Sequence, residues 1–341
     1  MTQSIALPMT ESTQVGEARR CANQMAARME LDDTTRGEIG IVVTEVANNL
    51  VKHAQGGELL LRELGGAHLG VEVLALDKGP GISNVARSLE DGYSTSGTPG
   101  TGLGAIRRLS RLFDIYSIMG QGTALVAHVL KGEPNESRRE SDGVELGAVN
   151  LPCKGEFESG DSWSVYSGPR VHKVIVADGL GHGPPAAEAS REAARIFDQY
   201  PDRRPAQMLE SIHLALRSTR GAAASIMELD LEAQEVRYTG VGNISACIVT
   251  PTERRNMVSH NGTIGHQVRK VQEFVYPWSY ASLLIMHSDG IATHWSLDSY
   301  PSLASKHPAL VAGILYRDFV RGRDDASIVV LRESRISTSK T

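Results

Sequence analysis

The chain has 341 residues, of which 41% are hydrophobic and 22% are charged, and its formal net charge at pH 7 is -5. This length exceeds that of a usual single domain, so we predict two compact domains. The composition is that of a folded globular protein. The mixture of acidic and basic residues excludes a strongly basic surface that would capture nucleic acid or an anionic membrane.

Cysteine usage and hydropathy indicate the compartment. Cys21, Cys153 and Cys247 lie far apart and form no CxxC pair, so the sequence predicts neither a zinc site nor a redox dithiol. No segment approaches the roughly 18 apolar residues that span a bilayer, and the N-terminus lacks the pattern of a secretion signal. We therefore expect a cytoplasmic protein.

The first half of the chain predicts helices and strands in mixed order. Residues 32–35 (DDTT) can cap a helix, and apolar side chains recur every three to four residues from Ile39 to Leu50, which predicts a helix that ends near His53. The elements expected after it are strands at 58–64 and 69–76 joined by a hairpin turn, a glycine-rich loop, a helix at 102–113, and strands around Ile115 and Leu125.

A polar segment divides the chain. Residues 132–143 (GEPNESRRESDG) are charged and nearly free of apolar side chains, and strand patterns flank them, so we place a linker here. The predicted organisation is a first domain at 1–131, a linker at 132–144, a second domain at 145–334 and a tail at 335–341.

The second half predicts two helices within a series of strands. Helices packed on layers of antiparallel-looking strands fit this order, so we expect a mixed α/β fold. The predicted strands lie near Val149, Val165 and 174–177 before helices at about 185–200 and 206–218, and at 225–231, 235–241, 245–249, 282–288 and 327–333 after them.

Polar residues of the first half stand at positions that suit ligand binding. Glu45 and Asn49 are four residues apart on the first long helix, so they share one stripe of its surface. Asp77 directly follows a strand and opens the turn DKGPG, where its carboxylate can accept hydrogen bonds. Gly79 and Gly81 allow that turn to be tight.

A glycine-rich loop and a strand complete an ordered set of motifs. Gly100, Gly102 and Gly104 (GTGLG) open a helix, where free N–H groups can receive a phosphate, and Gly122 and Thr123 stand on a closing strand. The order ExxxN, DxGxG, GxGxG and GT resembles the N, G1, G2 and G3 boxes of the GHKL ATPase superfamily over about residues 15–131. Within it, GYSTSGTPGTGLGAIRRL is similar to the RsbT-type serine kinases of stress signalling.

The resemblance implies an ATP-binding α/β sandwich and a role for each matched residue. Glu45 would polarise the acceptor hydroxyl as a base, Asn49 would bind Mg²⁺, and Asp77 would bind the amino group of adenine. Thr123 would support the adenine end. The glycines that would shape the pocket and its lid are Gly79, Gly81, Gly100, Gly102 and Gly104.

Aspartates of the second half recur at predicted strand ends. They are Asp161 in SGDSWSVY, Asp178 in VIVADGLGHG, Asp289 in LLIMHSDGI, and Asp324 with Asp325 in RGRDDASIVV. Hard divalent cations prefer oxygen ligands. Carboxylates that converge from several strands can hold two such ions, which can activate a water for attack on a phosphate.

The order of these motifs resembles the PP2C phosphatase superfamily over about residues 145–333, and DGLGHGPPAA is similar to its SpoIIE and RsbX branch. The resemblance implies an α-β-β-α sandwich with two Mn²⁺ or Mg²⁺ ions. Asp161, Asp178, Asp289 and Asp324 would be metal ligands, with Asp178 and Asp289 as catalytic residues, and Gly179 would contribute its backbone carbonyl.

Three residues of the second half each allow two interpretations. Asp325 stands where many relatives have Asn, and it is either a group behind the ligands or an alternative ligand. His182 either donates to the substrate phosphate or serves the start of the helix at Pro184. The role of Asn243 in TGVGN is similarly ambiguous.

The two resemblances together imply a bifunctional signalling protein of a partner-switching or stressosome pathway. The second domain would dephosphorylate serine or threonine on a STAS-type antagonist or scaffold protein, and the first would phosphorylate it with ATP. A downstream regulator is a further expected partner, whereas nucleic acid and membrane are not. The alternative is a first domain that does not catalyse, and instead senses ATP or binds a partner as an anti-sigma-like module.

Overall fold

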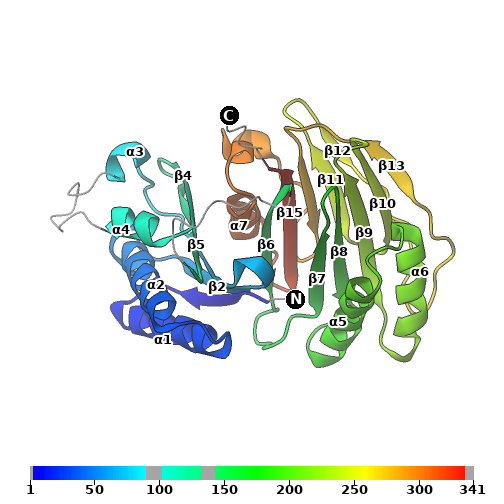
Figure 1. The fold of residues 1–341 in the computed structure, drawn as a ribbon, viewed down its shortest axis with the longest axis horizontal. Helices are drawn as coiled ribbons and strands as arrows, with labels where there is room; N and C mark the ends of the chain where they lie inside the picture. The colour runs from blue at the N-terminus through cyan, green and yellow to red at the C-terminus, as the bar shows by residue number, and fades with distance from the viewer. Residues whose placement is uncertain (1–2, 90–101, 133–142, 335–341) are drawn as a thin grey trace. The chain divides into compact units, whose positions relative to one another are not determined.

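The computed structural model describes residues 3–89, 102–132 and 143–334. They form two compact units (Figure 1): an N-terminal unit of residues 3–132 together with Ser305–Arg317, and a C-terminal unit of residues 143–304 and 318–334. The predicted linker lies mostly outside the described residues, as does the predicted tail at 335–341. In the described part of the chain, every helix is too short or too polar to cross a membrane.

The N-terminal unit is built on one five-stranded antiparallel sheet with β3 at its centre, in the order β1-β2-β3-β5-β4. Its strands are β1 (Ile5–Pro8), β2 (Glu58–Leu64), β3 (Gly70–Leu76), β4 (Leu112–Ile118) and β5 (Gly122–Leu130), and its helices are α1 (Ser12–Arg28), α2 (Asp33–His53), α3 (Val85–Ser88) and α4 (Gly102–Leu109). The predicted hairpin of β2 and β3 is confirmed by their antiparallel pairing.

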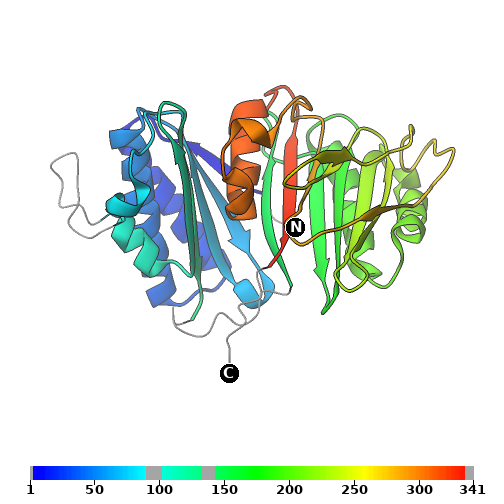
Figure 2. The same cartoon turned by 90° about the horizontal axis from the view of Figure 1, so that it is seen from above.

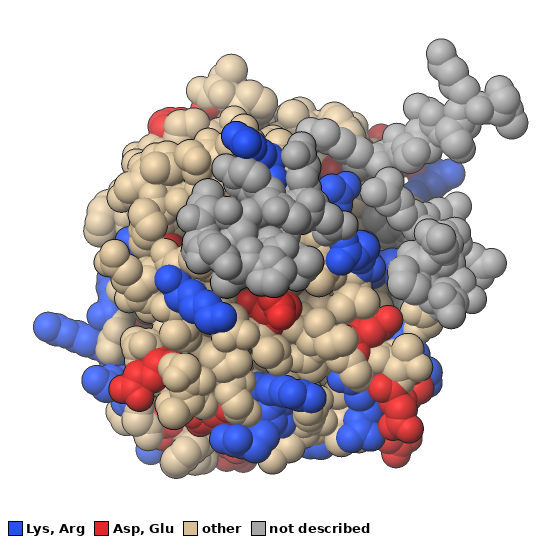
Figure 3. Space-filling view, turned by 90° about the vertical axis from the view of Figure 1, so that its left-hand side faces the viewer, with Lys and Arg blue, Asp and Glu red and all other residues tan. Residues whose placement is uncertain are grey.

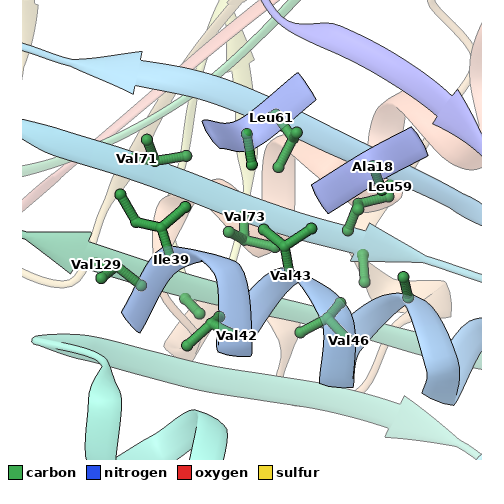
Figure 4. Packing of buried hydrophobic residues seen from close by; sticks show 14 of the residues in the cluster. Ala18, Ile39, Val42, Val43, Val46, Leu59, Leu61, Val71, Val73 and Val129 are labelled. Atoms are coloured by element: carbon green, nitrogen blue, oxygen red, sulfur yellow. The ribbon is translucent and has the colours of Figure 1, made fainter. Parts of the chain in front are cut away.

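Side chains of β3 alternate between the two faces of this sheet, as they must in a strand. Val71 and Val73 pack against the apolar residues of α2, which lie below them in the view of Figure 4. Leu74 and Leu76 point to the opposite face. There they meet α7 (Pro308–Phe319), where a Cβ added to Gly313 would lie 2.8 Å from Cδ2 of Leu76.

Helix α2 begins and ends where the sequence predicts. The side chain of Asp32 caps it by accepting a hydrogen bond from the N–H of Thr35 at 2.9 Å. Lys52 and His53 stand in its last turn, where positive charge is favourable. The buried residues that hold α2 on the sheet are Ile39, Val42, Val43, Val46 and Leu50.

The predicted helix at 102–113 is too long, because α4 ends at Leu109 and β4 begins at Leu112. The N–H of Arg111 donates to the carbonyl of His128 on β5 at 2.8 Å. The chain therefore already joins the sheet at Arg111, where pairing with β5 satisfies its backbone groups.

The C-terminal unit contains two five-stranded antiparallel sheets, in the orders β13-β10-β9-β8-β7 and β12-β11-β14-β15-β6. Helices α5 (Pro184–Gln199) and α6 (Pro205–Ala215) cover the first sheet (Figure 2). The strands are β6 (Val144–Leu151), β7 (Asp161–Ser167), β8 (Val171–Gly179), β9 (Ala222–Asp230), β10 (Glu235–Val241), β11 (Ser245–Val249), β12 (Arg254–Asn256), β13 (Phe274–Pro277), β14 (Leu283–His287) and β15 (Ala326–Glu333). The predicted mixed α/β fold is confirmed.

The alternation along β8 sets the direction of a predicted ligand. Val174 and Val176 belong to the core between the two sheets, whereas Ile175 and Ala177 belong to the core under α5 and α6. Asp178 continues the series of Val174 and Val176. Its side chain is therefore on the side of the second sheet.

Charged side chains of both signs are mixed on the face seen in Figure 3, where Lys and Arg stand beside Asp and Glu. The mixture agrees with the near balance of 35 basic and 40 acidic residues.

Candidate nucleotide and metal sites

Asp77 is fixed by backbone groups at the end of β3. Its Oδ1 accepts hydrogen bonds from the N–H groups of Gly79 (2.8 Å) and Thr123 (3.1 Å), and its own N–H donates to the carbonyl of Thr123 (2.9 Å). Burial raises the pKa of Asp77, while these hydrogen bonds and the positive charge of Arg317 act in the opposite direction. Because both N–H groups bond to Oδ1, Oδ2 is the oxygen that can accept from a ligand.

Close backbone contacts require the two glycines of the following turn. A Cβ on Gly79 would lie 2.7 Å from the carbonyl oxygen of Ala54 at the end of α2. A Cβ on Gly81 would lie 2.3 Å from the carbonyl oxygen of Ile118 on β4, and Gly81 has a φ of +77°. The turn after Asp77 is thus held between α2 and β4.

Thr123 interacts with a serine that the sequence analysis missed. The hydroxyl oxygens of Thr123 and Ser117 are 2.9 Å apart, and the Ser117 hydroxyl accepts a hydrogen bond from the N–H of Ile82 at 2.8 Å. Ser117 on β4 stands opposite Thr123 on β5. Pairing these last two predicted strands is the signal that could have identified it.

The remaining predicted residues of this unit gather at the start of α4. A Cβ on Gly102 would lie 3.0 Å from Oε2 of Glu45 and 3.8 Å from Oδ1 of Asn49, so the first turn of α4 approaches both side chains. Gly104 is buried in the same helix. Gly100 lies outside the described residues.

Helix α2 connects the two groups of residues. Glu45 and Asn49 lie within it, and Ala54 at its end contacts Gly79. Nine residues of helix from Glu45 to Ala54 correspond to about 14 Å, at a rise of 1.5 Å per residue. The predicted adenine residues and the predicted phosphate residues therefore follow one helix, an arrangement that suits an elongated ligand.

The predicted metal ligands come from strand ends in both sheets of the C-terminal unit. Asp161 opens β7 and stands directly opposite Asp178 on β8. Residues that face each other in this way point to the same side of the sheet. Asp289 follows β14 and Asp324 precedes β15, its neighbour in the second sheet.

Serine and asparagine side chains hold these carboxylates in place. Ser288 donates to Oδ2 of Asp161 at 2.6 Å and accepts from the N–H of Ser327 at 3.0 Å, which ties the first sheet to the second. The amide of Asn243 donates to Oδ2 of Asp289 at 2.7 Å. Asn243, which the sequence left open, is therefore a partner of a predicted ligand, and Ser288 and Ser327 are partners that the sequence analysis missed.

Burial and neighbouring carboxylates raise the pKa of Asp161 and of Asp178. Burial, followed by the negative charge of Asp161 and then of Asp289, raises the pKa of Asp178 far above its ordinary value. Burial is also the largest effect on Asp161, where the charges of Asp325 and Asp324 add to it and the hydrogen bond from Ser288 opposes it. Several buried carboxylates of like charge are costly unless a proton or a cation joins them.

Two oxygens of the cluster are suited to a cation. Oδ1 of Asp161 and Oδ2 of Asp325 are buried, and among the described residues neither has a hydrogen-bond partner. A buried acceptor without a partner is unfavourable, and a divalent cation would satisfy it. Carboxylate oxygens are the donors that Mg²⁺ and Mn²⁺ prefer.

The carboxylates of this cluster do not by themselves form a complete set of metal ligands. No group of three or more His, Cys, Asp or Glu side chains in the described residues is arranged so that it could hold an ion directly. The carboxylates are near enough to affect one another's charge over several ångströms, whereas coordination requires oxygens at about 2.0–2.6 Å from the ion. Mg²⁺ commonly keeps several waters among its ligands, so the carboxylates need not surround the ion on their own.

The remaining residues of the acidic motifs have defined surroundings. A Cβ on Gly179 would lie 2.0 Å from the carbonyl oxygen of Ala186, so α5 begins directly over this glycine. His182 Nδ1 lies 2.8 Å from Oε1 of Glu156, and the N-cap of α5 is Gly183 rather than His182. Asp325 is buried, and its Oδ1 accepts from the N–H of Cys153 at 2.8 Å.

These observations define a protein with a helix-and-sheet unit that carries a candidate nucleotide site and a double-sheet unit that carries an acidic site. Family models match both. The histidine kinase-like ATPase domain matches residues 8–128, and Stage II sporulation protein E (SpoIIE) matches residues 169–333.

Individual proteins match the same two parts. The serine/threonine-protein kinase RsbT of Bacillus subtilis (strain 168) is 32% identical over 126 residues, which cover 37% of this chain and 94% of RsbT. The phosphoserine phosphatase RsbX of the same organism is 26% identical over 153 residues, which cover 45% of this chain and 77% of RsbX. A solved structure from work on the bacterial stressosome as a modular system is 26% identical, with a TM-score of 0.52, and the match covers 55% of this chain and 99% of that one.

The chain therefore belongs to the RsbT-like family of histidine kinase-like ATPase domains in its N-terminal part, and its C-terminal part matches the SpoIIE family model. The resemblance predicted from the motifs is confirmed. The roles of the individual site residues stay predictions.

Proposed function

We propose that this chain sets the phosphorylation level of a regulatory protein through two opposed activities. The C-terminal domain removes phosphate from phosphoserine or phosphothreonine of a STAS-type protein, and the N-terminal domain restores it with ATP. Support comes from the match of one half to RsbT, a serine/threonine-protein kinase, and of the other to RsbX, a phosphoserine phosphatase. A downstream regulator that competes for the same protein would complete a partner-switching pathway.

The unpartnered Oδ1 of Asp161 carries the phosphatase half of the proposal, because it leaves a buried carboxylate oxygen ready for a cation. The residues that would hold two Mn²⁺ or Mg²⁺ ions are Asp161, Asp178, Asp289, Asp324 and the backbone carbonyl of Gly179. When bound, the ions supply positive charge at the phosphate oxygens and a lowered pKa for the attacking water. Ser288 orients Asp161 through their hydrogen bond, and Asn243 orients Asp289.

The approach of Gly102 to Glu45 supports the kinase half. Glu45 lies beside the predicted phosphate loop, and it would polarise the acceptor hydroxyl as a general base. Asn49 offers an amide oxygen for the Mg²⁺ that accompanies ATP, and Asp77 offers Oδ2 for the amino group of adenine. Phosphoryl transfer depends mainly on such positioning and on neutralised charge.

Phosphate release tests the phosphatase half. The purified chain is incubated with Mn²⁺ and a phosphoserine STAS protein, and Asp178→Asn and Asp289→Asn are compared with Asp202→Asn, which makes the same change at an exposed position. We expect the first two variants to lose roughly 10²–10³-fold in rate, because each removes a charged metal ligand. Release that survives in both, or no release by the wild type from any phosphoprotein, contradicts the proposal.

An ATP sensor is the second candidate function of the N-terminal domain. It is supported by the segment Ser305–Arg317, which lies late in the chain and belongs to the N-terminal unit. Glu45→Gln separates the candidates, with Glu17→Gln on the exposed side of α1 as the matched control. A kinase loses ATP-dependent phosphorylation of the STAS protein in Glu45→Gln and keeps ATP binding. A sensor keeps both ATP binding and signalling in that variant.

A further inference from the structure

The segment Ser305–Arg317 attaches to the N-terminal unit by polar contacts at its start. Lys306 forms an ion pair with Asp114 on β4, with Nζ and Oδ1 2.9 Å apart. The N–H of His307 donates to Oδ2 of the same carboxylate at 2.9 Å. Both residues fall within the range that matches SpoIIE, yet they bond to the ATPase-type sheet.

The helix that follows lies along β3 toward Asp77. Gly313 of α7 contacts Leu74 and Leu76, and the lack of a side chain at Gly313 lets the helix approach the strand closely. Tyr316 makes a side-chain hydrogen bond to Glu58 on β2. One residue later, Nη1 of Arg317 donates to the backbone carbonyl of Asp77 at 2.7 Å.

Arg317 completes the set of bonds around Asp77. Gly79 and Thr123 hold the side chain of Asp77 through Oδ1, and Thr123 also bonds its N–H. The carbonyl of Asp77 faces Gly122, where a Cβ would lie 2.1 Å from that oxygen, and Arg317 is its charged donor. Hydrogen bonds from charged donors are stronger and shorter than neutral ones.

We propose that Arg317 is a positioning residue of the nucleotide site, which fixes the backbone of Asp77 so that Oδ2 meets the amino group of adenine. The proposal rests on the proposed binding of ATP by the N-terminal domain. It adds that a residue from the segment matching SpoIIE sets the specificity for adenine. Arg317 acts through Asp77 and does not touch the nucleotide.

The test measures nucleotide affinity and base discrimination in the full chain. Fluorescent ribose-labelled ADP and GDP are titrated in excess Mg²⁺ against the wild type, Arg317→Met and Arg317→Lys. We expect Arg317→Met to bind ADP about tenfold more weakly and GDP unchanged, because one charge-assisted bond to Asp77 is lost. Lysine keeps a charged donor and should restore part of the preference for ADP.

Tyr316→Phe is the matched control on the same helix. It removes the hydroxyl that bonds Glu58 and leaves the contact with Asp77, so we expect wild-type discrimination between ADP and GDP. Arg317→Met with unchanged discrimination overturns the proposal, and so does an equal loss for ADP and GDP, which indicates general damage to the fold. A wild type that binds neither nucleotide instead refutes the proposed ATP site itself.

Discussion

Asp77 and Asp178 occupy the same kind of place, at the end of a buried strand, and their surroundings differ in charge. Burial raises the pKa of Asp77, and two backbone N–H groups and the positive charge of Arg317 oppose this effect. Asp178 is surrounded by carboxylates whose charge adds to the effect of burial and raises its pKa. The end of a strand therefore fixes only the position of an aspartate. The groups around the aspartate decide whether its carboxylate accepts a hydrogen bond from a neutral ligand or requires a cation.

Metal removal should give the largest difference between the two aspartates. We expect Mn²⁺ at about 100 times its Kd to stabilise the wild type by about 2.7 kcal/mol, seen as an increase of roughly 5–10 °C in the Tm of the C-terminal unit. Asp178→Asn should lose this increase. In EDTA the variant should unfold at a higher temperature than the wild type, because asparagine needs neither a proton nor a cation to be buried beside the other carboxylates.

Calorimetry with EDTA and with Mn²⁺ measures both effects, and Asp202→Asn, an exposed position, is the control. The control should behave as the wild type in both solutions. If Asp178→Asn unfolds at a lower temperature than the wild type in EDTA, the neighbouring carboxylates do not destabilise the metal-free protein. The proposed electrostatic difference between Asp178 and Asp77 would then be wrong.

Asp77→Asn should weaken nucleotide binding without a comparable gain in stability. Asparagine keeps one oxygen for the N–H groups of Gly79 and Thr123, and it replaces Oδ2 by an NH₂ group that faces another donor on adenine. We expect ADP affinity to fall roughly 10–100-fold, the equivalent of about 1.5–3 kcal/mol. Titration with labelled ADP measures it, with Asp33→Asn at an exposed position as the control. An unchanged affinity would show that Asp77 does not bind adenine.

Much of the fold and of both sites follows from local patterns. The cap at Asp32 and the spacing of apolar residues predict α2 with its bounds, and Asp161, Asp178, Asp289 and Asp324 stand at strand ends as the motifs indicate. The prediction of a helix at 102–113 was wrong at its C-terminal end, because pairing with β5 rather than helix propensity decides where α4 ends.

Helix α7 shows what the sequence could not provide. Eight consecutive residues, Pro308 to Leu315, are buried, so the segment has no alternation of apolar and polar residues that would predict an amphipathic helix. Arg317 is 240 positions from Asp77 in the chain. Its role depends on tertiary packing, and no local motif marks it.

Gly122→Ala should disturb the nucleotide site by a smaller amount than the loss of the Asp77 carboxylate. Gly122 has a φ of +96°, and a Cβ there would lie 2.1 Å from the carbonyl oxygen of Asp77. Gly120 is the control, because it has a φ of +76° and open space around its Cβ. Both alanine variants carry a left-handed penalty of roughly 1–2 kcal/mol.

Only Gly122→Ala should also lose ADP affinity, by about tenfold, as the Asp77 carbonyl shifts away from Arg317. Chemical denaturation gives the shared loss of stability, and titration with labelled ADP gives the separate loss of binding. Equal ADP affinities in the two variants would mean that the position of the Asp77 backbone does not matter for the nucleotide.

The prediction with the smallest expected effect tests whether the nucleotide site and the metal site act independently. Immediately after Arg317, the carbonyl of Phe319 accepts from the N–H of Ala292, and the N–H of Arg321 donates to the carbonyl of Gly290 at 2.8 Å. The segment whose Arg317 bonds to Asp77 therefore also bonds, a few residues later, to the turn that contains Asp289. A nucleotide that orders Arg317 should therefore also order this turn and raise the phosphatase rate.

We expect ADP to increase hydrolysis of p-nitrophenyl phosphate about fivefold at fixed free Mn²⁺, near the low end of usual coupling between sites. Arg317→Met should lose this increase and keep the basal rate, because Arg317 is not a metal ligand. Asp77→Asn serves as the control for chelation, since ADP in solution binds the same Mn²⁺ in both experiments. A rate that ADP changes equally in the wild type and in Asp77→Asn would show two independent sites on one chain, and the contrast between Asp77 and Asp178 would then be one of chemistry alone.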